Sequence, residues 1–237
     1  MPQRLVLLHG FTQTRQSWRR TVAALGGRYR ALAPDLPGHG QAAERRPASF
    51  SACTAYVRAL ADARCVLVGY SMGGRIALHA ALALPAIVER LVLIGASPGL
   101  ADAAEREQRR RDDEALADRI GAIGVAAFAE QWGAQPLFAG QDPRVAAAAH
   151  ADRLRNTPEG LAAALRGLGT GVMTPLWDRL GELAIPVTLV AGEHDAKFRE
   201  IAERMAVALP AARLEVVPGA GHAVQLERPE AVAAAIG

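Results

Sequence analysis

A serine in a glycine-rich turn is the residue of this chain whose side chain is most clearly placed to do chemistry. The segment GYSMGGR, residues 69–75, follows an apolar run and opens a stretch of helical composition. Gly69 and Gly73 stand two residues either side of Ser71, where side chains would collide with the adjoining strand or helix. The pattern predicts a strand–turn–helix elbow that lifts Ser71 to an exposed tip. The simpler interpretation is a turn whose serine caps the following helix.

Two residues that could activate the serine follow it in the order acid, then histidine. Asp195 comes after the apolar run VTLVAG and His222 after LEVVPGAG, so both are expected in loops at strand ends. A serine hydroxyl is a weak nucleophile or base until an imidazole accepts its proton, and a carboxylate must orient that imidazole. We therefore predict a catalytic triad of Ser71, His222 and Asp195. Glu193 and His194 are the nearest alternatives to Asp195 and His222.

Two backbone N–H groups are expected beside the serine. The segment LVLLHGFTQT is typical of a buried strand that runs into a glycine turn, which is where such an elbow finds an oxyanion donor. Phe11 is the predicted donor from this turn, and Met72, directly after the serine, is the second. Together they would stabilise negative charge developing on a substrate oxygen. His9 and His39, in glycine-flanked loops, are expected to be structural.

Composition limits the classes of protein to which the chain can belong. Its 237 residues are 51% hydrophobic, which predicts one domain with a large core and an insertion. The formal charge is only +3, and the 27 basic residues are 26 arginines and one lysine, Lys197. No basic run interleaves with aromatic residues, so nucleic acid is not an expected partner.

Cysteines and apolar runs exclude further classes. The two cysteines form no ligand cluster, so we expect no metal and no cofactor. A secretory leader and an apolar run of 18 residues are both missing, which predicts a soluble, cytoplasmic protein without membrane insertion. The sequence leaves the oligomeric state open.

The elements that position these residues alternate along the chain. Helical patterns separate most of six expected strands, near residues 4–8, 29–33, 65–69, 91–94, 187–191 and 213–217. This predicts an α/β fold with a mostly parallel sheet of about six strands, flanked by helices, and a site beyond the carboxyl ends of the strands. From Gly99 to about Thr174 only helical patterns occur. We expect the first part of the core over 1–98, an inserted helical lid over 99–175 and the second part over 176–237.

With these motifs the chain resembles the α/β-hydrolase fold and, within it, the 2-succinyl-6-hydroxy-2,4-cyclohexadiene-1-carboxylate synthase family of menaquinone biosynthesis. The resemblance covers nearly the whole chain and rests on HGFTQT, DLPGHG, GYSMGGR, SPGLADAAEREQRRRDD, WGAQPLF, LRNTPEG and GEHDAKF. It implies that the triad acts as a base that eliminates pyruvate from 2-succinyl-5-enolpyruvyl-6-hydroxy-3-cyclohexene-1-carboxylate.

The resemblance also implies which residues bind the substrate. Carboxylates would be held by Arg75, Arg109, Arg155 and Lys197, and the pocket would be shaped by Tyr70, Trp132 and Phe11. Arginine suits this role because its planar fork binds a carboxylate through two hydrogen bonds. The spacing in EREQRRRDD is equally typical of a solvated helix, so it does not by itself select Arg109. Gln225 stands where some relatives carry histidine.

Two other functions remain open at this point. A carboxylesterase or related small-substrate hydrolase would use the same three residues, with Ser71 forming an acyl-enzyme beneath an apolar lid. A non-enzymatic ligand receptor on the same fold is the remaining alternative. An apolar pocket would favour the esterase, and converging guanidinium groups the synthase.

Overall fold

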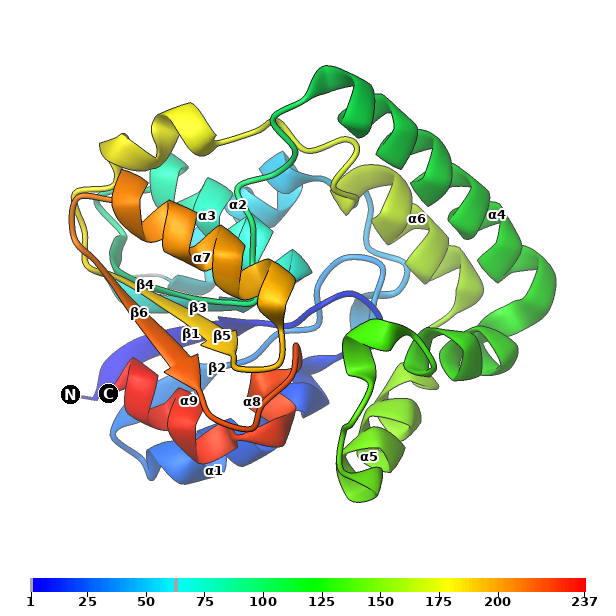
Figure 1. The fold of residues 1–237 in the computed structure, drawn as a ribbon, viewed down its shortest axis with the longest axis horizontal. Coiled ribbons are helices and arrows are strands. Elements are labelled where there is room, and N and C mark those ends of the chain that lie inside the picture. Colours follow the sequence, from blue (N-terminus) through cyan, green and yellow to red (C-terminus); the bar gives the residue numbers. More distant parts are fainter. Residues whose placement is uncertain (1, 62–63) are drawn as a thin grey trace.

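The computed structural model of the protein describes residues 2–61 and 64–237, and a parallel sheet lies at its centre (Figure 1). Its strands are β1 (Gln3–Leu8), β2 (Tyr29–Leu32), β3 (Cys65–Tyr70), β4 (Val88–Ile94), β5 (Val187–Gly192) and β6 (Ala212–Val217). They lie in the order β2-β1-β3-β4-β5-β6, and every neighbouring pair is parallel. The predicted α/β sheet of about six strands is confirmed. Only β4 begins clearly before its expected start, because pairing with β3 extends to Val88.

Helices cover both faces of the sheet. One face carries α1 (Arg19–Leu25), α8 (Val224–Glu227) and α9 (Pro229–Ile236), and the other carries α2 (Phe50–Ala61), α3 (Met72–Ala83) and α7 (Ala196–Ala208). Alternate residues of β1 supply the two cores: Leu5 and Leu7 pack toward the first set of helices, Val6 and Leu8 toward the second. Burial on both faces explains why the central strands carry nearly continuous apolar runs, such as LVLL in β1 and LVLI in β4.

Three helices are inserted between β4 and β5, within the segment 99–175 that we call the insert. They are α4 (Ala103–Gly133), α5 (Pro143–Arg153) and α6 (Pro158–Leu168). Gly124 breaks α4 with a φ of 75° and a ψ of 168°, a backbone conformation essentially restricted to glycine. The insert lies beside the sheet, with α4 outside and α6 between it and the core (Figure 1). The expected helical insertion is therefore present, without strands.

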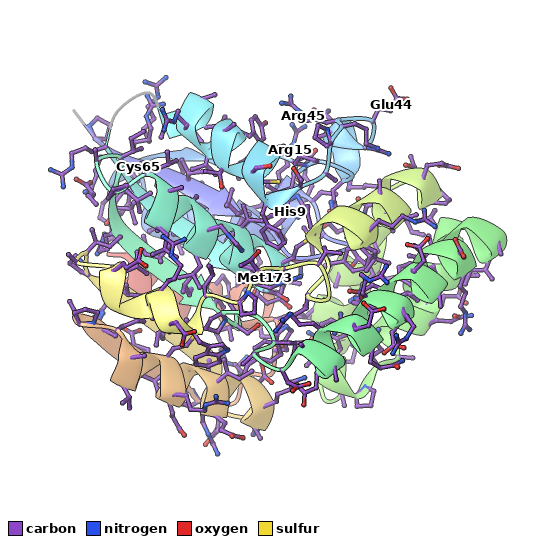
Figure 2. All side chains as sticks on the ribbon, turned by 90° about the horizontal axis from the view of Figure 1, so that it is seen from above. His9, Arg15, Glu44, Arg45, Cys65 and Met173 are labelled. Carbon is purple, nitrogen blue, oxygen red and sulfur yellow. The ribbon has the colours of Figure 1, made fainter. Side chains whose placement is uncertain are left out.

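Side chains fill the space between these layers. His9 lies in the interior, whereas Glu44 and Arg45 lie at the rim of the molecule (Figure 2). Among the described residues, no helix combines the length and the apolar character needed to cross a membrane.

Candidate active site

Ser71 lies in a tight turn between β3 and α3, held by close backbone packing. Its φ of 51° and ψ of −110° are unusual for a residue with a side chain. A Cβ built on Gly69 would lie 2.3 Å from the carbonyl oxygen of Gly73, and one on Gly73 would lie 2.2 Å from that of Leu8. Only glycine fits at both positions. The side chain of Ser71 does not cap the helix that it precedes, so the capping interpretation does not hold.

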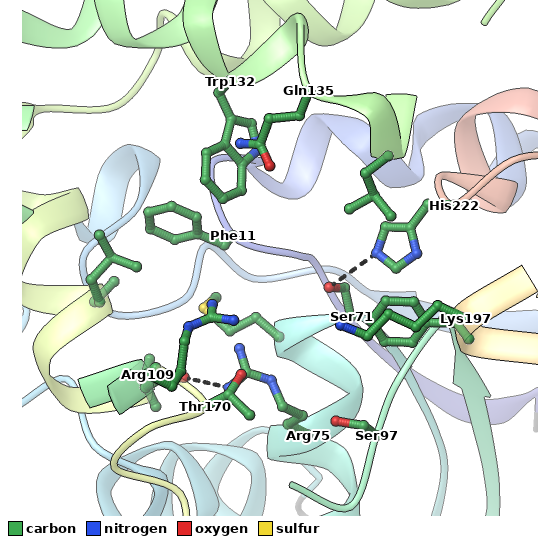
Figure 3. Close-up of a pocket in the computed structure, with 18 residues that line it drawn as sticks. Phe11, Ser71, Arg75, Ser97, Arg109, Trp132, Gln135, Thr170, Lys197 and His222 are labelled. Carbon is green, nitrogen blue, oxygen red and sulfur yellow. Dashed lines mark hydrogen bonds between the residues drawn. The ribbon is translucent and has the colours of Figure 1, made fainter. Parts of the chain in front are cut away.

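His222 and Asp195 lie beside this serine. Asp195 follows β5 at the start of α7, and His222 lies in the loop between β6 and α8. Nδ1 of His222 is 2.6 Å from Oδ2 of Asp195. Its Nε2 is 3.4 Å from Oγ of Ser71 (Figure 3). The side chains of His222 and Asp195 are buried, so water does not compete for the contact between them. This arrangement can carry a proton from the serine hydroxyl to the imidazole, which the carboxylate stabilises.

The alternatives Glu193 and His194 make other contacts. The carboxylate of Glu193 accepts a hydrogen bond of 2.8 Å from the N–H of Gly219. The backbone N–H of His194 donates to Ala220 at 2.9 Å, and its ring does not line the cavity beside Ser71. Both residues therefore bind the loop that leads to His222.

A cavity of about 270 Å³ opens beside Ser71 and His222. Phe11 and Met72, whose backbone N–H groups were predicted to form an oxyanion hole, both line it. The turn that carries Phe11 touches the serine, because a Cβ on Gly10 would lie 3.6 Å from that of Ser71. Trp132 of α4 also lines the cavity and meets the Phe11 ring edge-on, at 5.2 Å between centroids.

Three cations reach the same cavity from three elements: Arg75 from α3, Arg109 from α4 and Lys197 from α7 (Figure 3). Arg75 is half-buried and donates from Nη1 to the carbonyl oxygen of Leu168 at 2.9 Å. Burial, and then the charge of Arg109, lower the pKa of Arg75 to about 10. Nε of Arg109 is 2.8 Å from Oδ1 of Asp113. Among the described residues that line the cavity, none is Asp or Glu, so its wall is suited to an anion.

Two residues expected to bind substrate lie elsewhere. Tyr70 is 3% exposed and packs against the His222 ring, at 5.3 Å between centroids, behind the cavity wall. The side chain of Arg155 is 59% exposed and approaches Asp152 at 3.9 Å. Because α5 ends at Arg153, the chain turns there and directs Arg155 outward. The expectation that these two side chains face the cavity does not hold.

The arginine that points inward at this position is Arg153. It is 5% exposed, and its guanidinium lies over the ring of Phe138 at 5.2 Å. Burial lowers the pKa of Arg153, while Tyr70 and Asp152 act in the opposite direction. Its Nε has no hydrogen-bond partner among the described residues. Because α5 is rich in alanine, its sequence shows no distinct apolar face. The sequence therefore could not have identified Arg153 as the inward-pointing arginine.

Neutral polar residues also line the cavity without having been predicted: Ser97, Gln135 and Thr170. They stand in loops or at helix ends, where neither periodicity nor charge distinguishes them. Gln225 is fully buried outside the cavity and donates from Nε2 to Oε1 of Gln13 at 3.1 Å. Its side chain therefore forms no part of the cavity wall.

Comparisons with known proteins identify the family to which the chain belongs. The chain matches the model of the "Alpha/beta hydrolase family" over residues 5–235. A Serratia proteamaculans protein named 2-succinyl-6-hydroxy-2,4-cyclohexadiene-1-carboxylate synthase is 35% identical over 97% of this chain and 90% of its own. A Bacillus subtilis protein given that name provisionally is 38% identical over 95% of this chain and 85% of its own.

Solved structures share the fold over the whole chain. The structure of MenH from S. aureus superposes with a TM-score of 0.93 at 32% identity, covering 99% of this chain and 91% of that one. A thermophilic esterase from Thermogutta terrifontis, with malate bound, has a TM-score of 0.86 at 29% identity, covering 100% and 88%. The chain therefore belongs to the alpha/beta hydrolase family and, within it, to the family of the 2-succinyl-6-hydroxy-2,4-cyclohexadiene-1-carboxylate synthases.

Proposed function

We propose that this protein is a carbon–oxygen lyase that eliminates pyruvate from 2-succinyl-5-enolpyruvyl-6-hydroxy-3-cyclohexene-1-carboxylate, as a step of menaquinone biosynthesis. The observation that carries the proposal is the convergence of Arg75, Arg109 and Lys197 on a cavity that also contains Ser71 and His222. A substrate with several carboxylates needs such fixed cations. The relatives that carry the synthase name support the same reaction.

In this reaction the serine acts as a base. His222 accepts the Ser71 proton at Nε2 as the serine oxygen removes a proton from a ring carbon of the substrate. The electron pair of that C–H bond, at ring carbon 2, forms a double bond between carbons 2 and 3. The existing double bond moves from carbons 3 and 4 to carbons 4 and 5, and the C–O bond from carbon 5 to the enolpyruvyl group breaks. The departing enolate takes up the proton held by His222 and is released as pyruvate. Asp195, 2.6 Å from Nδ1, holds the imidazole in the required tautomer and stabilises its cation.

The surrounding groups bind and orient the substrate. The N–H groups of Phe11 and Met72 serve as an oxyanion hole for the substrate oxygen on which charge develops. Arg75, Arg109 and Lys197 bind carboxylates, while Phe11 and Trp132 pack against the ring. The insert acts as a lid, because α4 and α6 supply part of the wall that separates the cavity from water.

Carboxylester hydrolysis is the second candidate, supported by the likeness to the T. terrifontis esterase. In that reaction Ser71 would attack an ester carbonyl and form an acyl-enzyme, and the same oxyanion hole would stabilise the tetrahedral intermediate. Three cations on the wall favour the synthase, because a neutral ester gives them no partner after their water is removed.

Pyruvate release separates the two functions. The adduct is generated enzymatically from isochorismate and 2-oxoglutarate, and pyruvate is measured beside a panel of short-chain p-nitrophenyl esters. We expect rapid pyruvate release and slow ester cleavage, with both lost in Ser71→Ala. Wild-type protein that cleaves the esters well and leaves the adduct unchanged would instead be an esterase.

A further inference from the structure

The turn that carries Phe11 contains a residue in an unfavourable backbone conformation. Residues 10–13, which we call the oxyanion turn, are closed by a hydrogen bond of 3.2 Å from the N–H of Gln13 to the carbonyl of Gly10. The third residue of this turn, Thr12, has a φ of 68°. Glycine is favoured at that place in a turn, and a β-branched residue with positive φ is an outlier. The conformation persists only if neighbouring groups hold it.

Two side chains hold Thr12 through its own backbone. Its N–H donates to Nε2 of His39 at 3.3 Å, and its carbonyl accepts a hydrogen bond of 2.7 Å from Nδ2 of Asn156. His39 belongs to the core, whereas Asn156 belongs to the insert, in the connection between α5 and α6. The residue directly after Phe11 is thus fixed from both sides.

Asn156 is itself fixed by other contacts. Its Oδ1 accepts from the N–H of Gly40 at 3.0 Å, and its Nδ2 also donates to the carbonyl of Arg153 at 3.0 Å. With 5% of its surface exposed, it makes these bonds away from water. Asp152, on the last turn of α5, adds a second connection, because its Oδ2 accepts from the N–H of Thr14 at 2.9 Å.

We infer that Asn156 is a positioning residue of the oxyanion hole, through which the insert helps to aim the Phe11 N–H. Asn156 does not line the cavity, so it acts through the peptide of Thr12. The insert then has two roles: it covers the cavity and it completes the geometry of the catalytic backbone. This inference rests on the proposed role of the Phe11 N–H and is independent of which substrate the enzyme uses.

The test replaces the amide group of Asn156. Asn156→Asp keeps the size of the side chain and the acceptor for Gly40, but removes the donor to the Thr12 and Arg153 carbonyls and adds a negative charge. We expect kcat to fall roughly tenfold to hundredfold, up to the loss caused by removing one oxyanion donor, with KM within about twofold. The same fall is expected in the rate at which a p-nitrophenyl phosphonate labels Ser71, because its phosphoryl oxygen occupies the oxyanion hole. Labelling needs neither proposed substrate.

Two further variants make the result specific. Thr157→Ala removes the N-cap of α6, whose Oγ1 accepts from Gly160 at 3.1 Å, so it weakens the insert without touching the oxyanion turn. We expect it to keep the wild-type kcat and labelling rate. Thr12→Gly in the Asn156→Asp background is expected to restore most of the lost rate, because glycine adopts positive φ without support.

The inference is overturned by any of three results. The first is that Asn156→Asp is labelled by the phosphonate and turns over substrate at the wild-type rates. The second is that Thr157→Ala loses as much activity as Asn156→Asp. The third is that Thr12→Gly leaves the defect of Asn156→Asp unchanged. Should Asn156→Asp fail to fold, Asn156→Ala with and without Thr12→Gly gives the same comparison. If wild-type protein released no pyruvate from the adduct but was labelled by the phosphonate faster than Asn156→Asp, the proposed function would be refuted and this inference would stand.

Discussion

The candidate site draws its side chains from two regions that hold them differently. Ser71, Asp195 and His222 project from turns at the ends of strands, and the turn at Ser71 is held by backbone so closely packed that only glycine fits at positions 69 and 73. Arg109 and Trp132 project from α4 of the insert, and the side chain of Arg109 is 44% exposed. Core residues are thus fixed by the chain path itself, whereas insert residues depend on side-chain partners. Substitutions in the two regions should therefore differ in size and in kind.

Removing the core base should have the largest effect. We expect Ser71→Ala to lower kcat for pyruvate release roughly 10²-fold to 10⁴-fold, the usual contribution of a positioned base. Thermal unfolding should stay at the wild-type midpoint, because alanine occupies the same space in the turn. A coupled lactate dehydrogenase assay measures the rate. Activity within threefold of wild type would mean that Ser71 is not the base. The expected difference between core and insert residues would then not hold.

Removing a cavity cation should have a smaller and substrate-dependent effect. We expect Arg109→Ala and Lys197→Ala each to lower kcat/KM for the adduct about tenfold to hundredfold, because a charge-assisted hydrogen bond contributes roughly 1.5–3 kcal/mol. Hydrolysis of a neutral p-nitrophenyl ester should change little. Arg111→Ala is the matched control, since Arg111 lies two residues away, is exposed and pairs with Glu107. Equal losses for Arg109→Ala and Arg111→Ala would assign the effect to overall charge.

The carboxylate that holds Arg109 should matter less than the cation itself. Asp113 is buried and its Oδ2 has no hydrogen-bond partner among the described residues. We expect Asp113→Asn to raise KM for the adduct about threefold to tenfold, equivalent to a partly exposed ion pair of about 1 kcal/mol, while kcat is retained. Asp112→Asn, on the exposed side of the same turn of α4, serves as the control. An unchanged KM in Asp113→Asn would mean that Arg109 is oriented by other contacts.

The remaining effect is on stability instead of catalysis and concerns pH and the core histidines. Burial lowers the pKa of His9 and of His39 below the usual 6.5; His9 further lowers that of His39, whereas the Gly10 carbonyl, Asp35 and Asp152 oppose the shift in His9. Both rings are neutral in the folded protein. Below about pH 6.5 the unfolded chain therefore binds more protons than the folded protein, and stability decreases as the pH is lowered.

A variant can isolate one of these rings. His39→Gln keeps an acceptor for the Thr12 N–H and removes one titrating group. Urea unfolding from pH 7.5 to 5 should show a shallower decline in the variant, by up to about 1.4 kcal/mol per pH unit. Parallel pH profiles for wild type and variant would mean that protonation of His39 is not coupled to unfolding.

That Ser71, Asp195 and His222 lie together could be predicted from the sequence, for a physical reason. The turn around Ser71 needs glycine on both sides, and parallel strands end at one edge of the sheet, so spacing alone places the serine, the acid and the histidine. No such rule fixes the insert. Arg153, at the end of the alanine-rich helix α5, and Arg155, just beyond it, look equivalent in the sequence, and packing against Phe138 selects the first.

Other differences have the same origin. Tyr70 is the last residue of β3, and the alternation along the strand directs it into the core with His222. The position of the insert brings three neutral polar residues to the cavity, namely Ser97, Gln135 and Thr170. No local sequence pattern indicates that position. Asn156 and Asp152 contact residues more than 130 positions earlier in the chain. Contacts over such separations follow from the completed fold.

The two ends of the insert leave the sheet and return to it at neighbouring points. Leu176 donates to the carbonyl of Pro98 at 2.8 Å, and β4 pairs directly with β5. For protein engineering, the intervening segment is therefore an exchangeable cassette, since closing a longer or shorter connection costs little while the strand ladder stays intact. A transplanted cassette would have to bring its own amide for the Thr12 carbonyl, so grafts that copy only cavity-lining residues are expected to bind ligands and turn them over slowly.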